Sequence, residues 1–350
     1  MPQRNFRIEP FVPTETSEAL WENYFKFNDA IHYEISPDPD DKPMPHHVMR
    51  RFMKDPSPYQ ELHRWLAFDE DGNVIAYCHA SFASEKAPNY QENKHVCDVS
   101  LRVAKDHRRQ GLGTELMRHA IGVGMKKHAT VLHTFTSHET GKAFSEWLGG
   151  EVAIEAAENR LKLNEVDWGM IETWNNEGPE RAPDVQLDMF EDISDDDIEP
   201  YCELYTILMN QQPLGELDFE EKTTPEKRRV QEKETRDKGC KWFTKITRES
   251  NGDISGTTEI FYIPDQPHKV HQMLTGVHEN YRGKGLGKWL KSNMLLYIRD
   301  HYPDVKTIVT GNADSNAPML SINERIGFKR YLGEVVYKYS VQQVCEKLGV

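Results

Sequence analysis

Two glycine-rich stretches hold the residues of this sequence whose types and spacing fit a defined chemistry. The first is HRRQGLGT, from His107 to Thr114, and the second is YRGKGLGK, from Tyr281 to Lys288. Each follows an apolar segment and precedes an amphipathic one, which is the order of a strand, a turn and a helix. Glycines at such a turn expose the backbone N–H groups of the helix start, and these groups together with the helix dipole bind phosphate oxygens. The cations in both stretches strengthen the prediction of two phosphate-binding loops.

Neither stretch matches the two best-known phosphate loops. A Walker loop requires four residues between its first glycine and a Gly-Lys-Ser/Thr sequence. Here Gly283 lies too close to Gly287, and Trp289 follows Lys288. The dinucleotide-binding fingerprint Gly-x-Gly-x-x-Gly also fails. It requires two residues between its second and third glycines, whereas here one residue separates Gly285 from Gly287. Neither of these two nucleotide-binding motifs is therefore predicted.

The two stretches repeat at a constant interval in the chain of 350 residues. Arg282 minus Arg108 is 174, and Val277 minus Val103 is again 174. This interval is too long for a solenoid repeat and fits a duplicated domain.

Periodicity predicts the same order of elements in both halves: strand, helices, three strands, glycine loop, helix, strand, helix and strand. Turn-forming residues around Asn175–Pro179 interrupt this order. We therefore predict an N-terminal domain over residues 1–164, a linker over 165–183 and a C-terminal domain over 184–350.

Composition excludes several classes of protein. The formal net charge of −14 argues against a general nucleic-acid binder and would attract cationic substrates such as amines. The five cysteines are scattered without CxxC spacing and no HExxH occurs, so neither a disulfide framework nor a metal site is predicted. The N-terminus lacks an apolar signal core, and no apolar run reaches 18 residues. We expect a cytoplasmic protein without a membrane partner, either a monomer or a homodimer.

The glycine stretches resemble the acyl-CoA pyrophosphate loop Arg/Gln-x-x-Gly-x-Gly/Ala of the GNAT acetyltransferase superfamily. The pattern occurs as Arg108-x-x-Gly111-x-Gly113 and as Arg282-x-x-Gly285-x-Gly287. With two copies, the chain is similar to tandem GNAT proteins, and its two-domain layout resembles that of the mycothiol synthases. The resemblance implies two α/β domains, each with a mixed sheet, and an N-acetyltransferase that uses acetyl-CoA as cosubstrate. We expect direct transfer to a small-molecule primary amine in a ternary complex.

The resemblance also implies which residues hold acetyl-CoA. In the family, the strand before the loop splays from its neighbour, and the pantetheine arm lies in that gap. The implied contacts of the C-terminal half are Leu274, Thr275, Gly276, Val277, Arg282, Gly283, Lys284, Gly285, Leu286, Gly287, Lys288 and Asn316. Those of the N-terminal half are Val103, Arg108, Arg109, Gln110, Gly111, Leu112, Gly113 and Thr114.

The two halves differ in how closely they follow the family pattern. Asn316 resembles the residue that bonds the CoA arm, and Gly327-Phe328 resembles the pair that closes the following helix. The first half has His138 and Gly149-Gly150 at those places. The resemblance therefore places catalysis in the C-terminal half and leaves the first half as a retained CoA site or a scaffold.

Amine acetylation needs a base for the amine proton, a donor for the thioester oxygen and a proton for the leaving thiolate. The family often places a Glu eleven residues before the loop's Arg/Gln, where this sequence has His271. We predict His271 as the base, because strand alternation puts it on the same face as Val277. Glu259 is the competing candidate. The resemblance assigns the oxygen's donor to the backbone N–H near Val277.

The position of the proton donor departs from the family pattern, and two other functions stay open. The family Tyr, four residues before Gly-Phe, is replaced by Asn323, which has no titratable proton. Tyr331, Tyr337, Tyr339 or solvent are the alternatives. The rival functions are acetylation of a protein N-terminus or Lys, and a non-catalytic acyl-CoA sensor, which Asn323 favours.

Overall fold

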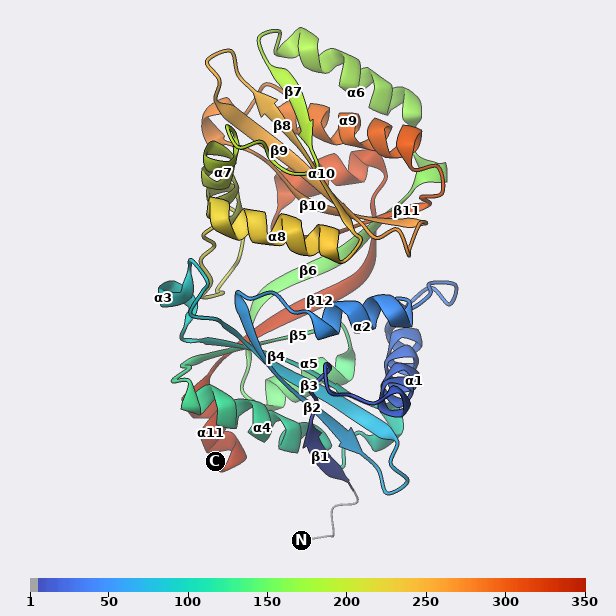
Figure 1. Ribbon diagram of the computed structural model, residues 1–350, viewed down its shortest axis with the longest axis vertical. Coiled ribbons are helices and arrows are strands. Elements are labelled where there is room, and N and C mark those ends of the chain that lie inside the picture. Colours follow the sequence, from blue (N-terminus) through green and yellow to red (C-terminus); the bar gives the residue numbers. More distant parts are fainter. Residues whose placement is uncertain (1–5) are drawn as a thin grey trace. The chain divides into compact units, whose positions relative to one another are not determined.

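The computed structural model describes residues 6–350, which form two compact units (Figure 1). Unit 1 holds the chain up to Glu155 together with Gly215–Glu220 and Leu332–Val350. Unit 2 holds Ala156–Leu214 and Glu221–Tyr331.

Unit 1 is built on a mixed sheet with strand order β1-β2-β3-β4-β5-β12. Its strands are β1 (Arg7–Pro10), β2 (Gln60–Phe68), β3 (Val74–Ala83), β4 (Val96–Val103), β5 (Val131–Thr136) and β12 (Lys329–Ser340). Its helices are α1 (Glu18–Ile35), α2 (His46–Lys54), α3 (Tyr90–Asn93), α4 (Leu112–Lys126), α5 (Glu139–Trp147) and α11 (Val341–Leu348). Successive residues of β2 enter two cores: Trp65 packs in the core that contains α4, and Leu66 in the core that contains α1. Helices therefore cover both faces of the sheet.

Unit 2 repeats this plan with strand order β6-β11-β10-β9-β8-β7. Its strands are β6 (Glu151–Lys162), β7 (Gln186–Phe190), β8 (Lys241–Arg248), β9 (Ile254–Tyr262), β10 (Lys269–Val277) and β11 (Thr307–Ala313). Its helices are α6 (Trp168–Arg181), α7 (Ile198–Asn210), α8 (Pro225–Asp237), α9 (Leu286–His301) and α10 (Ala317–Ile326). On β8, Phe243 belongs to the core that holds α9, whereas Ile246 belongs to the core that holds α7. The two α/β units confirm the predicted fold class.

The compact units differ from the boundaries expected from the sequence, because the last strand of each half joins the other unit. β6 pairs with β11 of unit 2 along residues 156–162, and β12 pairs with β5 of unit 1 along residues 335–340. Periodicity predicts a strand but not the sheet that it joins, since tertiary packing determines which strand it pairs with.

The segment 165–183, expected as a linker, forms α6 and belongs to unit 2. Asp167 caps the helix by accepting the N–H of Met170 at 3.1 Å. Gly178 allows close packing against α9, since a Cβ at this position would lie 2.3 Å from the Trp289 ring. The glycine in this segment, which suggested a turn, thus allows α6 to pack closely against α9.

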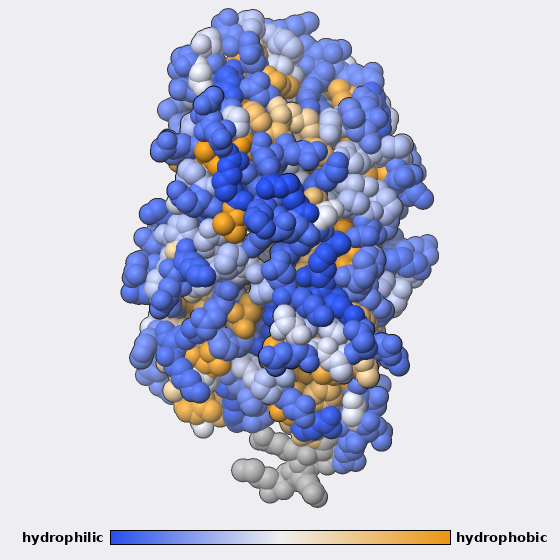
Figure 2. All heavy atoms as spheres, in the orientation of Figure 1, coloured by the Kyte–Doolittle hydropathy of each residue, from blue (hydrophilic) through white to orange (hydrophobic). Residues whose placement is uncertain are grey.

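Polar residues cover most of the face shown in Figure 2, and apolar residues appear there in small separate groups. Within residues 6–350, no helix is long and apolar enough to cross a membrane. The same residues contain no group of three or more His, Cys, Asp or Glu side chains that could hold a metal ion.

Candidate functional site

Both glycine stretches form the predicted turn from a strand into a helix. Gly111 and Gly285 precede α4 and α9 with φ values of 83° and 80°, the left-handed region that favours glycine. Among the pairings of the described residues, β4 meets β5 over 96–99 and β10 meets β11 over 269–271. The rest of β4 and of β10 runs on without that parallel neighbour. The splay of these strands, which the resemblance implied, is therefore present in both units.

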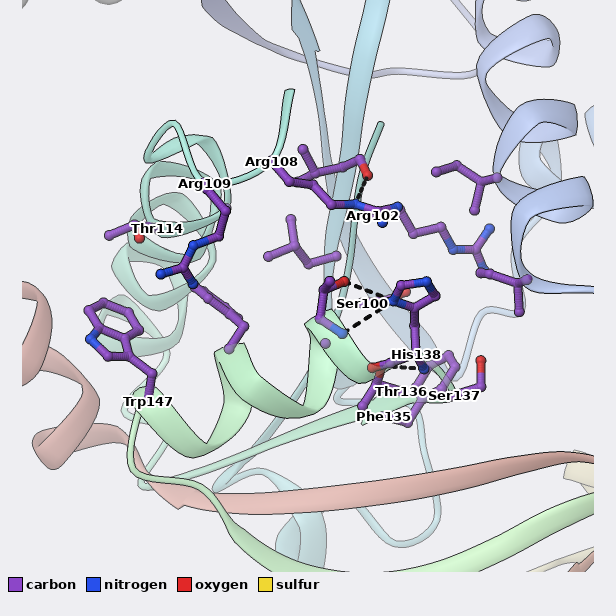
Figure 3. A pocket seen from close by; sticks show the side chains of 18 of the residues that line it. Ser100, Arg102, Arg108, Arg109, Thr114, Phe135, Thr136, Ser137, His138 and Trp147 are labelled. Atoms are coloured by element: carbon purple, nitrogen blue, oxygen red, sulfur yellow. Dashed lines mark hydrogen bonds between the residues drawn. The ribbon is translucent and has the colours of Figure 1, made fainter. Parts of the chain in front are cut away.

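A cavity lies at each glycine loop, with a volume of about 590 Å³ in unit 1 and about 840 Å³ in unit 2. In Figure 3, Arg109 and Trp147 lie on one side of the unit 1 cavity, and Arg102 and His138 lie on the other.

Most of the residues expected to hold acetyl-CoA line these two cavities. In unit 2 they are Leu274, Thr275, Gly276, Val277, Arg282, Gly283, Gly285, Leu286, Gly287, Lys288 and Asn316. In unit 1 they are Val103, Arg108, Arg109, Gly111, Gly113 and Thr114. Lys284, Gln110 and Leu112 are not among the lining residues: Lys284 pairs with Glu249 at 3.1 Å, the Gln110 amide donates to the Asp106 carbonyl at 2.9 Å, and Leu112 is buried.

The first arginine of each loop is bonded to the strand before it. Nε of Arg108 donates to the Val103 carbonyl at 2.9 Å, and Nε of Arg282 donates to the Val277 carbonyl at 3.0 Å. Both guanidinium groups thus fasten the loop to its strand. Backbone N–H groups at the helix start are then the donors that the loop offers to a phosphate.

The second partner of this arginine is charged in unit 1 and neutral in unit 2. Glu34 accepts from both terminal nitrogens of Arg108 at 2.6 Å, and Nε2 of His138 lies 3.4 Å from the same carboxylate. The hydrogen bonds from Arg108 hold the pKa of Glu34 below its usual range. In unit 2, Arg282 donates instead to the amide oxygen of Gln211 at 2.6 Å. The ion pair with Glu34 therefore neutralises the charge of Arg108, and the unit 1 loop offers an anionic ligand one cation fewer.

Cations from three helices gather at the loop of unit 2. Lys288 lies in the first turn of α9, Arg181 ends α6, and Arg325 lies in the last turn of α10. Lys288 Nζ and Arg325 Cζ lie 5.2 Å and 4.7 Å from the centroid of the Trp174 ring, and a Cβ at Gly285 would be 3.3 Å from the Arg181 guanidinium. Burial lowers the pKa of Lys288, and the two arginines lower it further. Glu177 already pairs with Arg181 at 2.5 Å, so Lys288 and Arg325 are the cations of this cluster that fit a phosphate group.

Strand β10 bulges where it forms the wall of the unit 2 cavity. Two steps along β9, from Ile260 to Thr258, are matched by three steps along β10, from Gln272 to Thr275. Nε2 of Gln272 donates to the carbonyl oxygen of Glu259 at 2.6 Å, in place of a ladder N–H. A bulge frees backbone N–H groups from the sheet. The corresponding strand β4 of unit 1 pairs with β3 without a register shift. The bulge is therefore a feature of the unit 2 cavity and not of the unit 1 cavity.

The bulge also decides the face on which His271 lies. Alternation predicted that His271 and Val277 share a face, but the extra residue reverses the alternation and puts them on opposite faces. The shared face was therefore a wrong prediction. His271 is half-buried and is not among the residues that line the cavity, and burial lowers its pKa. Its role as a base stays a prediction.

Glu259, the competing base, lies in a buried network of charges. Its Oε1 accepts from Tyr201 at 2.5 Å, from Arg228 at 2.9 Å and from Thr244 at 3.1 Å. Nε of Arg228 also donates to Glu232 at 3.1 Å, and all three charged side chains are at most 1% exposed. Because a cation and two hydroxyl groups hold this carboxylate, it is poorly placed to take a proton from a substrate in the cavity.

One titratable group in the wall of the unit 2 cavity was not expected from the sequence. Lys291, on α9, is 3% exposed, and its Nζ donates to Oδ1 of Asn323 at 2.7 Å. Nδ2 of Asn323 donates in turn to Oδ1 of Asn312 at 2.8 Å, and Asn312 also lines the cavity. Burial lowers the pKa of Lys291 to about 7. An amine that titrates near neutrality therefore adjoins Asn323, which stands where the resemblance implied a Tyr.

Comparisons with known proteins agree with this geometry. The sequence model of the acetyltransferase (GNAT) family matches residues 20–149 and 198–328, once in each half. A search of curated proteins found no match.

Three solved structures share the fold over nearly the whole chain. A tandem GNAT protein from the clavulanic acid biosynthesis pathway, solved without AcCoA, has a TM-score of 0.74 at 20% identity, covering 96% of this chain and 98% of that chain. A GCN5-related N-acetyltransferase from Sphaerobacter thermophilus has a TM-score of 0.67 at 16% identity, covering 97% and 96%. A glucosamine N-acetyltransferase region of a fungal multi-domain GH3 β-N-acetylglucosaminidase has a TM-score of 0.66 at 11% identity, covering 97% of this chain and 38% of that chain.

Proposed function

The chain belongs to the acetyltransferase (GNAT) family, and on that premise we propose that unit 2 transfers the acetyl group of acetyl-CoA directly to a small-molecule primary amine. The observation that carries the proposal is the bulge of β10 in the wall of a cavity that opens at a glycine loop. Freed backbone N–H groups beside the splayed strands are suited to stabilise the negative charge that develops on a thioester oxygen.

The residues of unit 2 match the parts of acetyl-CoA in order. The N–H groups at the start of α9 and the cations Lys288 and Arg325 suit the phosphates. The gap between β10 and β11 suits the pantetheine arm. An arm in this gap would put the thioester next to the bulge of β10. The amine, once it has lost a proton to water, attacks the carbonyl carbon and a C–N bond forms. The C–S bond then breaks with its electron pair on sulfur, the nitrogen loses its second proton, and CoA leaves as the thiolate or thiol.

The other wall of the cavity supports a small acceptor. Tyr205, Leu208 and Met209 of α7, followed by Gln211–Pro213, line the cavity on that side. These mostly apolar side chains beside the place proposed for the thioester suit a small acceptor. The net charge of −14 attracts amines in their protonated form.

A panel of acceptors tests the proposal. CoA release from acetyl-CoA would be followed with small primary amines, with peptides that carry a free N-terminus or Lys, and without an acceptor. We expect turnover with small amines and the acetylated amine as product. Turnover with peptides alone would support protein acetylation, and acetyl-CoA binding without turnover on any acceptor would support a sensor.

His271→Ala tests the predicted base. Because His271 lies outside the cavity wall, we expect the rate of acetyl transfer to change far less than the roughly 10²–10⁴-fold that removal of a general base costs. Since burial lowers the pKa of His271, a base role would put the acid limb of the pH–rate profile below a pH of about 6.5. Loss of that limb in the variant, together with a rate loss of about 10²-fold or more, would establish His271 as the base after all.

A further inference from the structure

The buried ammonium group of Lys291 is costly for the fold. Its partner among the described residues is the neutral amide of Asn323, and the Phe328 ring centroid lies 5.4 Å away. A buried cation without a carboxylate destabilises a protein, and an apolar side chain of similar length would fill the space without that penalty. Perturbed titratable groups in cavity walls are candidates for chemistry.

Asn323 and Asn312 hold the ammonium in one orientation. Nδ2 of Asn323 donates to Asn312, so Oδ1 is the atom that faces Lys291 and accepts from it. An ammonium group has three donors, and among the described residues one of them is used. Two donors remain, and Lys291 is among the residues that line the cavity.

The position of Lys291 on α9 relates it to the phosphate loop. Lys291 follows Gly287 by four residues, so the two share a helix face and lie about 6 Å apart along the axis. Gly287 and Asn312 line the same cavity. A ligand with phosphates at Gly287 and an arm between β10 and β11 therefore passes Lys291.

We propose that Lys291 is the general acid of unit 2 and that Asn323 is its positioning residue, an inference that rests on the proposed function. As the C–S bond of the tetrahedral intermediate breaks, its electron pair goes to sulfur and Nζ of Lys291 gives sulfur a proton. The neutral Lys291 then regains a proton from water, which has received the one released by the amine. The products are the acetylated amine and CoA as the free thiol.

The acidity of the two groups suits this transfer. Burial lowers the pKa of Lys291 to about 7, whereas a thiol has a pKa of about 8.5. The proton therefore moves from the weaker base to the stronger one. A general acid works in its protonated form, so this contribution is largely complete about one pH unit below 7 and is lost as the pH rises through about 7.

Lys291→Met removes the proton and keeps the length of the side chain. At pH 6.5 we expect kcat to fall by about 10²-fold, while the affinity for acetyl-CoA measured by calorimetry changes by no more than a few-fold. The decline in the wild-type pH–rate profile above a pH of about 7 should disappear. Wild-type kcat and an unchanged pH profile in this variant would overturn the proposal, and absence of turnover in the wild type would instead refute the proposed function.

Asn323→Asp and Lys245→Met separate chemistry from structure. A carboxylate beside Lys291 stabilises its charged form, so Asn323→Asp should move the alkaline decline to higher pH. Lys245 is the matched control, because it is also buried and its Nζ also donates to a side-chain amide oxygen, that of Asn293. Burial lowers the pKa of Lys245 to about 8, but this residue does not line the cavity. Lys245→Met should leave the pH profile unchanged. An unmoved decline in Asn323→Asp, or the same profile in both lysine variants, would contradict the assignment.

Discussion

Replacing Arg228 by Met is expected to lower the free energy of unfolding by about 3–5 kcal/mol. Arg228 joins the carboxylates of Glu259 and Glu232, and all three side chains are at most 1% exposed. Without the guanidinium group, Glu259 loses its cation in a place that water does not reach. Urea unfolding and the midpoint of thermal unfolding measure the change.

Arg236→Met is the matched control on the same helix. Arg236 forms an ion pair with Asp192 in which the side chains are 54% and 45% exposed. Pairs of this kind contribute about 0–1 kcal/mol, because solvent screens them. If Arg228→Met destabilised the protein no more than Arg236→Met, the buried network would not depend on its cation.

Gly287→Asp is expected to abolish productive acetyl-CoA binding in unit 2. Gly287 is the second residue of α9, and a Cβ there would meet Ile322 at an ordinary 3.7 Å, so the fold accepts the change. An acidic residue in the first turn even suits the helix dipole. A carboxylate about 4 Å from a phosphate opposes it by about 4 kcal/mol at an effective dielectric constant of 20, which is about 10³-fold in affinity. Calorimetry with acetyl-CoA and CoA release measure this loss.

Gly113→Asp makes the equivalent change in unit 1. Gly113 is the second residue of α4, and its Cβ would lie 3.6 Å from Leu101. We expect most of the turnover to survive, because β4 pairs without a bulge and Glu34 neutralises Arg108 at the unit 1 loop. The opposite ranking of the two variants would assign the chemistry to unit 1.

The sequence predicted the parts of the site that local rules determine. Glycines at 111 and 285 are required by left-handed backbone at a helix start, and a repeat of 174 residues showed that the arrangement occurs twice. Strands and helices around the loops followed from hydrophobic periodicity.

Features that depend on partners in space escaped the sequence. The bulge between Gln272 and Thr275 has no marker that alternation can detect, and it reversed the face predicted for His271. Arg181 lay in the supposed linker, where its approach to the loop from α6 could not be seen. Lys291 did leave a signal: it precedes Leu295 and Ile298 by four and seven residues, which puts a lysine on the apolar face of α9.

The most direct test of unit 2 as the site of acetyl transfer is a crystal structure with acetyl-CoA bound and no acceptor present. We predict pyrophosphate oxygens on the backbone N–H groups that follow Gly285, the pantetheine arm between β10 and β11, and the thioester sulfur within hydrogen-bond reach of Lys291 Nζ. The carbonyl oxygen should face the N–H groups at the bulge. Acetyl-CoA bound in the unit 1 cavity alone, or in unit 2 with its thioester turned away from the bulge, would contradict this account.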